Sequence, residues 1–181
     1  MLEKNNVKAT FFVTGDWVKQ YPNDVKKIAK AGHELGNHSE DHKSMLNMTE
    51  KQCSDEIMKV HERVKKLTGV DMNLFRTPYG DFNNTILSTA RNNGYYTIQW
   101  DIDTYDWKDY TADCIVNRAV NNEYLGNGSI LLMHEGGKNT VKALGGIIEG
   151  LQEKGYEFVP VSKLIHKKNY VIDSSGRQVV R

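Results

Sequence analysis

Two histidines four residues apart, His38 and His42, are the first residues whose types and spacing indicate chemistry. Imidazoles at this spacing would lie on one face of a helical turn, where one first-row divalent metal could bind both. Neutral imidazole suits Zn, Co and Ni. Two imidazoles are an incomplete set for a catalytic zinc, which usually takes three protein ligands. The alternative interpretation is two exposed histidines at the start of a helix.

A third histidine and a group of carboxylates each follow a predicted strand. His134 ends an apolar run and could act as a general acid or base, because the pKa of imidazole lies close to neutrality. Residues 103–107 (DTYDW) supply carboxylates that could fix a histidine tautomer, and Trp107 offers a flat face for a sugar ring. The alternatives are a core histidine with one hydrogen bond and an ordinary surface loop.

Residues 76–80 (RTPYG) form a fourth segment of this kind. Arg76 at a strand end can hold a carboxylate through two hydrogen bonds, and the turn after it could point a backbone N–H at a developing oxyanion. In isolation, a plain turn with a surface arginine is the more common case. All four segments follow predicted strands, and chemistry collects at the C-terminal ends of parallel strands, so each strengthens the others.

The elements that must position these residues alternate along the chain. Strands are predicted at residues 7–13, 33–37, 73–76, 95–102, 129–133 and 156–159, and helices at 22–31, 49–67, 84–93, 111–124 and 140–154. The clearest helix begins with a capping box of Thr49 and Gln52 and continues with apolar residues at helical spacing. The alternation favours an α/β domain with a parallel sheet, open or closed.

Composition excludes several classes of protein. The 181 residues are 39% hydrophobic and 26% charged, which is typical of a globular domain. A formal net charge of +1 gives no strong electrostatic field to attract a nucleic-acid backbone, which argues against a nucleic-acid-binding protein. No apolar run approaches the length of a membrane span. Two cysteines, Cys53 and Cys114, cannot form a disulfide scaffold; two buried thiols are expected, although one bridge is conceivable.

In this order and at these spacings, the segments resemble the polysaccharide deacetylase family, carbohydrate esterase family 4, with its nodulation-type deacetylase homology domain. The matching segments are residues 8–13 (KATFFV), 36–42 (GNHSEDH), 76–80 (RTPYG), 103–107 (DTYDW) and 131–134 (LLMH). The resemblance covers residues 1–165 as one domain and leaves 166–181 as a C-terminal extension. It implies an irregular (β/α) barrel of the seven-stranded type.

The resemblance also implies a reaction. Family members remove N-acetyl or O-acetyl groups from chitin-type sugars, peptidoglycan glycans or acetylxylan. His38 and His42 would bind a divalent metal, zinc above all, with Co or Ni as alternatives. His134 would be the general acid that protonates the leaving amine, and Asp106 would orient and tune it. The expected partner is therefore an acetylated polysaccharide or oligosaccharide.

The remaining implied roles concern the substrate. Leu132 would line the pocket for the acetyl methyl group, and Trp107 would form one wall of the substrate groove. The backbone N–H of Tyr79 would join the metal in stabilising the oxyanion, and Arg76 would hold a catalytic carboxylate. Thr77 stands where many members have proline.

One family segment is missing from the sequence. Members carry a strand ending in Thr-Phe-Asp-Asp-Gly before the segment that matches residues 8–13; its first Asp is the catalytic base and its second is a metal ligand. We expect that the chain lacks the first strand and most of the first helix, as a truncation or a natural remnant. The metal would then bind weakly and activity would be impaired. An open sheet edge would favour an edge-paired or swapped dimer.

Two other functions are compatible with the same residues. One is a non-catalytic carbohydrate-binding module on this fold. The other is a different α/β metallohydrolase that uses Asp41 or Asp106 as its third ligand. The family resemblance implies that the protein is located in the cell envelope or the extracellular space.

Overall fold

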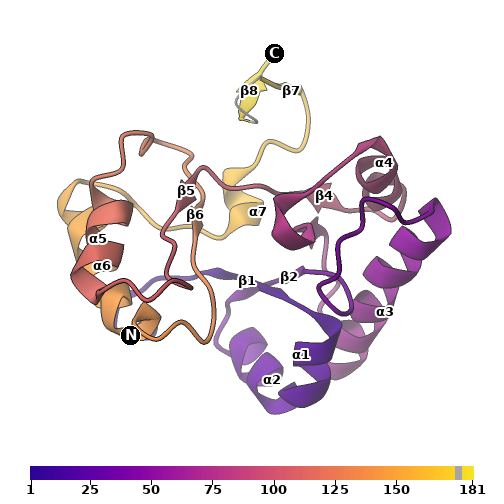
Figure 1. Ribbon diagram of the computed structural model, residues 1–181, viewed down its shortest axis with the longest axis horizontal. Helices are drawn as coiled ribbons and strands as arrows, with labels where there is room; N and C mark the ends of the chain where they lie inside the picture. Colours follow the sequence, from indigo (N-terminus) through magenta and orange to yellow (C-terminus); the bar gives the residue numbers. More distant parts are fainter. Residues whose placement is uncertain (174–176) are drawn as a thin grey trace. The chain divides into compact units, whose positions relative to one another are not determined.

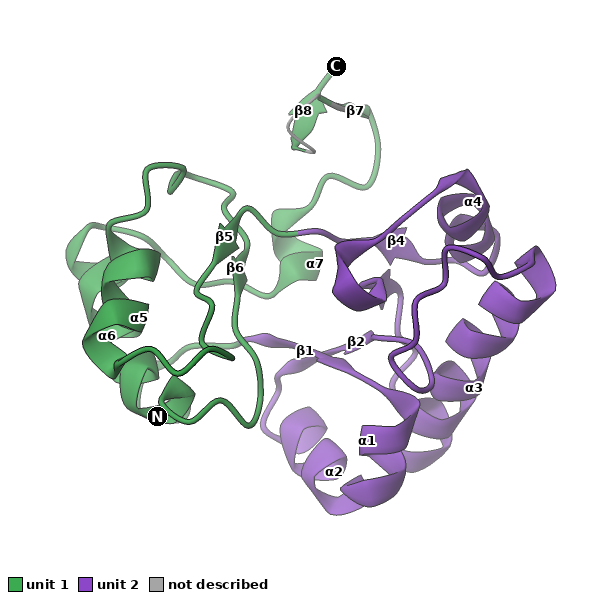
Figure 2. Cartoon of the chain, viewed as in Figure 1, with its two compact units in different colours: residues 1–8, 100–181 green, residues 9–99 purple. Residues whose placement is uncertain are grey.

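The computed structural model describes residues 1–173 and 177–181. The chain divides into two compact units: unit 1 comprises Met1–Lys8 and Trp100–Arg181, and unit 2 comprises Ala9–Gln99 (Figure 2). Helices follow parallel strands in each unit (Figure 1), which confirms the predicted α/β class. Within the described residues, the helices are all too short or too polar to cross a bilayer.

Unit 2 contains a four-stranded parallel sheet in the order β1-β2-β3-β4. Its strands are β1 (Thr10–Val13), β2 (Glu34–Asn37), β3 (Leu74–Phe75) and β4 (Tyr96–Thr97). Its helices are α1 (Gly15–Gln20), α2 (Pro22–Lys30), α3 (Glu50–Thr68) and α4 (Asn84–Asn92), with a short 3-10 turn at Pro78–Gly80. The β1–β2 register pairs Val13 with Asn37, so both strands end at the same edge, where β2 leads into the histidine segment.

Helix α3 forms as its sequence predicts. The Thr49 hydroxyl accepts from the Gln52 backbone N–H, and the Gln52 side chain accepts from the Thr49 N–H, which completes the capping box. The apolar face of the helix, Cys53, Ile57, Val60 and Val64, is fully buried in the core of unit 2. Complete burial of an aliphatic side chain stabilises a fold by about 1.5–3 kcal/mol, so this face anchors the unit.

Unit 1 is built around two strands and two packed helices. Its elements are a 3-10 turn at Glu3–Asn5, β5 (Ile102–Asp103), α5 (Ala112–Val120), β6 (Leu131–Leu132), α6 (Thr140–Glu153), α7 (Val161–Leu164), β7 (Tyr170–Ile172) and β8 (Gln178–Val180). Strands β5 and β6 are parallel, whereas β7 and β8 form an antiparallel hairpin within the predicted extension. Helices α5 and α6 approach closely because Gly146 and Gly150 face Val116 and Val120.

Three predicted elements differ from the structure. The strand predicted at residues 95–102 is two strands, β4 and β5, in different sheets. The strand predicted at residues 156–159 is wrong: its alternation reflects Tyr156 and Phe158 packing against the α5–α6 core without a partner strand. The helix predicted to reach Tyr124 ends at Val120, and α1 was not predicted.

The two cysteines are both free thiols. Cys53 is fully buried on α3, whereas Cys114 on α5 is only partly buried. The expectation of two unbridged thiols is confirmed, and the expectation that both are buried holds for Cys53 alone.

Candidate active site

The two histidines predicted as metal ligands lie in the loop after β2, which we call the histidine loop (residues 38–42). The ring centroids of His38 and His42 are 4.8 Å apart with an interplanar angle of 79°. The predicted helical turn is wrong, because Ser39 (φ 67°) and His42 (φ 58°) both have left-handed backbone conformations. Each such residue costs on the order of 1–3 kcal/mol and persists only where its surroundings fix it.

The backbone of the histidine loop is fixed by the start of α1. Gly15 N–H donates to the Ser39 carbonyl at 3.0 Å, and Asp16 N–H donates to the Glu40 carbonyl at 2.9 Å. Within the loop, the His42 N–H donates to the Ser39 hydroxyl at 3.2 Å. These contacts hold the backbone in its left-handed turns and thereby keep the two rings adjacent.

A buried polar network supports the end of β2. The side chain of Asn37 accepts from the Ser39 N–H at 3.1 Å and donates to the Ile57 carbonyl at 2.8 Å. It also donates to the Tyr95 hydroxyl at 3.3 Å, which lies 2.7 Å from His61 Nδ1. Burial raises the pKa of Tyr95 to about 12, so its hydroxyl stays protonated. Sequence analysis did not identify Asn37 as a supporting residue.

The tautomer of His38 follows from its partner. His38 Nδ1 lies 2.7 Å from the Arg76 carbonyl oxygen. A carbonyl only accepts, so Nδ1 carries the proton and Nε2 keeps the lone pair that a metal requires. The imidazole pair fits a divalent metal in this respect. Among residues 1–173 and 177–181, however, no three His, Cys, Asp or Glu side chains gather closely enough to hold a metal ion.

The segment at residues 76–80 lies beside the histidine loop. The Tyr79 ring centroid is 4.8 Å from that of His42, and the Tyr79 side chain is largely exposed on a left-handed backbone (φ 58°). The Arg76 guanidinium lies 4.8 Å from the Phe12 ring centroid. The Thr77 hydroxyl is buried with no hydrogen-bond partner among the described residues. Unit 2 therefore brings together the predicted residues His38, His42, Arg76 and Tyr79.

Unit 1 brings together the predicted pair Asp106 and His134. Asp106 is 1% exposed and accepts from the His134 N–H at 2.8 Å, from His134 Nδ1 at 2.9 Å and from the Thr140 hydroxyl at 2.8 Å. Burial alone would raise the pKa of Asp106, but these hydrogen bonds outweigh it and lower the pKa below its usual value. Thr140 was predicted only as the start of a helix, so its hydrogen bond to Asp106 was missed.

The other two predicted residues of unit 1 differ in exposure. Trp107 is 56% exposed, and the Lys108 ammonium nitrogen lies 5.0 Å from its ring centroid. Leu132 is 3% exposed in β6, and its carbonyl accepts from the Thr104 hydroxyl at 2.9 Å. The exposed indole is available to a ligand, whereas the contact of Leu132 with an acetyl group stays a prediction.

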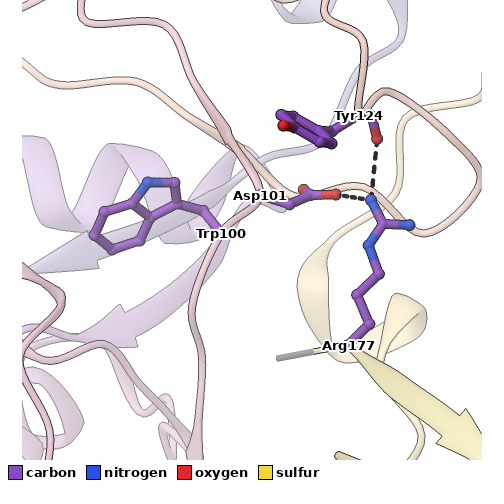
Figure 3. Close-up of a pocket in the computed structure, with 4 residues that line it drawn as sticks. All are labelled: Trp100, Asp101, Tyr124 and Arg177. Carbon is purple, nitrogen blue, oxygen red and sulfur yellow. Dashed lines mark hydrogen bonds and ion pairs between the residues drawn. The ribbon is translucent and has the colours of Figure 1, made fainter. Parts of the chain in front are cut away.

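A separate pocket of about 460 Å³ lies in unit 1 at the N-terminal end of β5. It is lined by Trp100, Asp101, Tyr124 and Arg177 (Figure 3). The Arg177 guanidinium pairs with the Asp101 carboxylate and donates to the Tyr124 carbonyl at 3.0 Å. Asp106 and His134 follow the C-terminal ends of β5 and β6, and no predicted site residue lines this pocket.

The family profile described as polysaccharide deacetylase matches residues 1–98 of the chain. The peptidoglycan-N-acetylmuramic acid deacetylase PdaA of Bacillus subtilis is 34% identical over 182 residues, which cover 96% of this chain and 67% of PdaA. The chain belongs to the polysaccharide deacetylase family. A peptidoglycan-N-acetylglucosamine deacetylase of Bacillus cereus is 36% identical over 167 residues, covering 90% of this polysaccharide deacetylase chain and 60% of its relative.

Solved structures of family members share the fold. A peptidoglycan N-acetylglucosamine deacetylase, crystallised with 4-naphthalen-1-yl-N-oxidanyl-benzamide, gives a TM-score of 0.85 at 36% identity, over 90% of this chain and 77% of that one. A CE4 family pseudoenzyme from Bacillus anthracis gives a TM-score of 0.85 at 33% sequence identity, and the match covers 90% of this chain and 57% of the pseudoenzyme. These matches confirm the predicted family and its α/β fold. The chain spans 51–67% of the length of the first curated relatives.

Proposed function

We propose that this polysaccharide deacetylase chain carries a metal-dependent hydrolase that removes acetyl groups, above all N-acetyl groups, from peptidoglycan or a related polysaccharide. The observation that carries the proposal is the orientation of His38. Its Nδ1–H is engaged by the Arg76 carbonyl, and its ring stands 4.8 Å from the ring of His42. This arrangement leaves Nε2 of His38 as a metal donor beside a second imidazole.

His38 and His42 would hold the divalent cation, with zinc first and Co or Ni as alternatives. When bound, such a cation polarises an acetyl carbonyl and lowers the pKa of its water to about 7 in favourable sites. Two imidazoles without a carboxylate hold a metal less tightly than a set of three ligands. We therefore propose weak binding of the metal by the chain as printed.

His134 would supply the proton to the leaving amine. An amide nitrogen is a poor leaving group until it is protonated, and imidazole is the side chain suited to this transfer near neutral pH. Because Nδ1 is committed to the Asp106 carboxylate, the proton that is transferred must be carried on Nε2. The role of Asp106 is to fix this tautomer and the ring orientation.

The substrate would be held by the residues that the family resemblance indicates. The exposed Trp107 ring offers a stacking face for a sugar, and the backbone N–H of Tyr79 offers a donor to the oxyanion. Leu132 would contact the acetyl methyl group, and Arg76 would orient a catalytic carboxylate.

The chain as printed would be a slow enzyme, because its sequence contains no adjacent pair of aspartates. In the family, such a pair supplies the general base and a metal ligand. General base catalysis contributes about 10²–10⁴ in rate, and a chain without the base forgoes that contribution.

The test is acetate release from a chitooligosaccharide and from peptidoglycan, with and without zinc. We expect slow release that requires zinc and that falls at least about 100-fold in His134→Ala. His166→Ala is the matched control, because His166 is an exposed histidine in the C-terminal extension. Equal rates for His134→Ala and the unmodified chain would contradict the assignment of the general acid.

A non-catalytic carbohydrate-binding module is the second candidate. It is favoured by the resemblance to the Bacillus anthracis pseudoenzyme and by the missing aspartate pair. This function predicts glycan binding, lost in Trp107→Ala, without acetate release at any zinc concentration. Tryptophan fluorescence during glycan titration measures the binding. The predicted cell-envelope or extracellular location and the edge-paired or swapped dimer stay predictions.

A further inference from the structure

The histidine loop contains two carboxylates, Glu40 and Asp41, neither of which the proposed reaction uses, and the carboxylate of Glu40 is paired with cations from two helices. Arg63 binds the Glu40 carboxylate through both terminal nitrogens of its guanidinium: Nη1 donates to Oε2 at 2.7 Å and Nη2 donates to Oε1 at 2.9 Å. Lys19 Nζ lies 2.5 Å from Oε1. The Glu40 side chain is 12% exposed, whereas the Arg63 and Lys19 side chains that pair with it are 29% and 50% exposed.

The same residue is held through its backbone. The Glu40 carbonyl accepts from the Asp16 N–H at the start of α1, and the Glu40 N–H donates to the Glu56 carboxylate on α3 at 3.0 Å. Lys19 lies on α1 and Arg63 lies on α3. Side chain and backbone of Glu40 therefore both connect the histidine loop to these two helices of unit 2.

The space around Glu40 is also specified by a glycine. A Cβ placed on Gly15 would lie 1.9 Å from Glu40 Oε2 and 2.6 Å from Arg63 Nη1. The first residue of α1 must therefore lack a side chain for the carboxylate to reach this position. This steric requirement is independent of the ion pairs and points to the same close approach.

We propose that Glu40 is a positioning residue that holds His38 and His42 in the spacing needed for the metal, an inference that rests on the proposed function. Glu40 lies between Ser39 and His42, the two left-handed residues of the loop, which belongs to no helix or strand. A bidentate arginine fixes the direction of a carboxylate, and such outer partners set the orientation of metal ligands. Both Glu40 oxygens already face cationic donors, so Glu40 orients the ligands and is not itself one.

The experiment measures the affinity of the full chain for Zn²⁺ alone by isothermal titration calorimetry. We expect Glu40→Gln to weaken binding about 10–100-fold, as substitution of an outer partner of a metal ligand does. Arg63→Gln should weaken Zn²⁺ binding similarly. The double variant should bind Zn²⁺ no more weakly than the weaker-binding of the two single variants, because the two side chains act as a unit. Arg63→Lys keeps the positive charge but loses the two parallel hydrogen bonds of the guanidinium. Its Zn²⁺ affinity should therefore fall between that of the unmodified chain and that of Arg63→Gln.

Asp55→Asn is the matched control, because it removes the exposed Lys51–Asp55 ion pair on the same helix, α3. It should leave Zn²⁺ affinity unchanged. Histidine ring NMR signals of the metal-free chain provide a second readout: Glu40→Gln should shift those of His38 and His42, and Asp55→Asn should not. If Glu40→Gln fails to fold, Arg63→Lys decides the question by the same measurements.

Two outcomes separate this inference from the proposed function. Zn²⁺ affinity kept within twofold in Glu40→Gln and Arg63→Lys, but lost in His38→Ala, would overturn the positioning role and leave the metal pair standing. Affinity kept in His38→Ala would overturn the metal pair itself, and with it the positioning role that depends on it.

Discussion

The histidine loop of unit 2 and the Asp106–His134 pair of unit 1 position their imidazoles in different ways. The loop carries left-handed residues and is held by many contacts: two N–H groups of α1, the Ser39 hydroxyl and the Glu40 ion pairs. In the pair, one carboxylate with no exposed side-chain surface accepts all three hydrogen bonds. The loop therefore distributes its support, whereas the pair concentrates it in Asp106.

This difference predicts different responses to substitution. Loss of one contact in the histidine loop leaves the others in place, so stability should decline gradually. Loss of Asp106 leaves three donors without their acceptor at once, and buried polar groups without partners are costly. The following predictions test this contrast, beginning with the largest expected effect.

Asp106→Ala should lower the free energy of unfolding by about 3 kcal/mol, because it removes the buried acceptor of three hydrogen bonds. Urea unfolding followed by circular dichroism measures this loss. Asp109→Asn, an exposed carboxylate of the same loop, is the control and should change the value by less than about 0.5 kcal/mol. A loss for Asp106→Ala as small as that of the control would remove the contrast between the two regions.

Gly15→Ala should lower the free energy of unfolding by about 1–2 kcal/mol, because the added methyl group displaces the Glu40 carboxylate and strains a packed site. The same urea experiment applies. Gly126→Ala is the matched control in unit 1, since its added Cβ meets no atom within 4 Å. An unchanged stability in Gly15→Ala would mean that Glu40 moves freely, contrary to its close approach to α1.

The smallest expected effect is a change in acid sensitivity that the two carboxylates share. Burial would raise the pKa of Glu40 and of Asp106, but hydrogen bonds and cations lower both below their usual values. Each carboxylate therefore contributes stability above its unfolded-state pKa of about 4, and this contribution is lost as the pH falls through the lower folded-state pKa. Glu40→Gln and Asp106→Asn should both flatten the decline in stability below about pH 4.

Added salt separates the two carboxylates. The ion pairs of Glu40 are partly exposed and should weaken in 0.5 M NaCl, where screening acts over about 4 Å. The hydrogen bonds of Asp106 are buried and should not. Thermal unfolding from pH 5 to pH 2.5 at low and high salt measures both effects; an equal response of the two variants to salt would contradict the difference in burial.

Sequence patterns predicted the elements whose signals are local. The capping box of Thr49 and Gln52 and the apolar repeat of α3 depend on neighbours in the chain, and the structure has both. The placement of Asp106 and His134 after β5 and β6 also followed from the alternation of elements, because neighbouring parallel strands end at the same edge.

The missed features depend on contacts between distant residues. The left-handed turns at Ser39 and His42 are stabilised by α1, so local spacing suggested a helix that does not exist. Residues 156–159 alternate because one face packs against helices, which period-two patterning cannot distinguish from strand pairing. Thr140 contacts Asp106, 34 residues away in sequence, and Glu40 contacts Arg63, 23 residues away. Local sequence patterns do not indicate contacts over such separations.

The distribution of the two free cysteines gives each unit its own intrinsic probe. Cys53 is sealed in the core of unit 2, and burial raises the pKa of its thiol, whereas Cys114 in unit 1 is partly accessible. A thiol reagent should therefore modify Cys114 first and reach Cys53 only when α3 opens. The order and rate of alkylation, read by mass spectrometry, would report the opening of the two units separately without any engineered label.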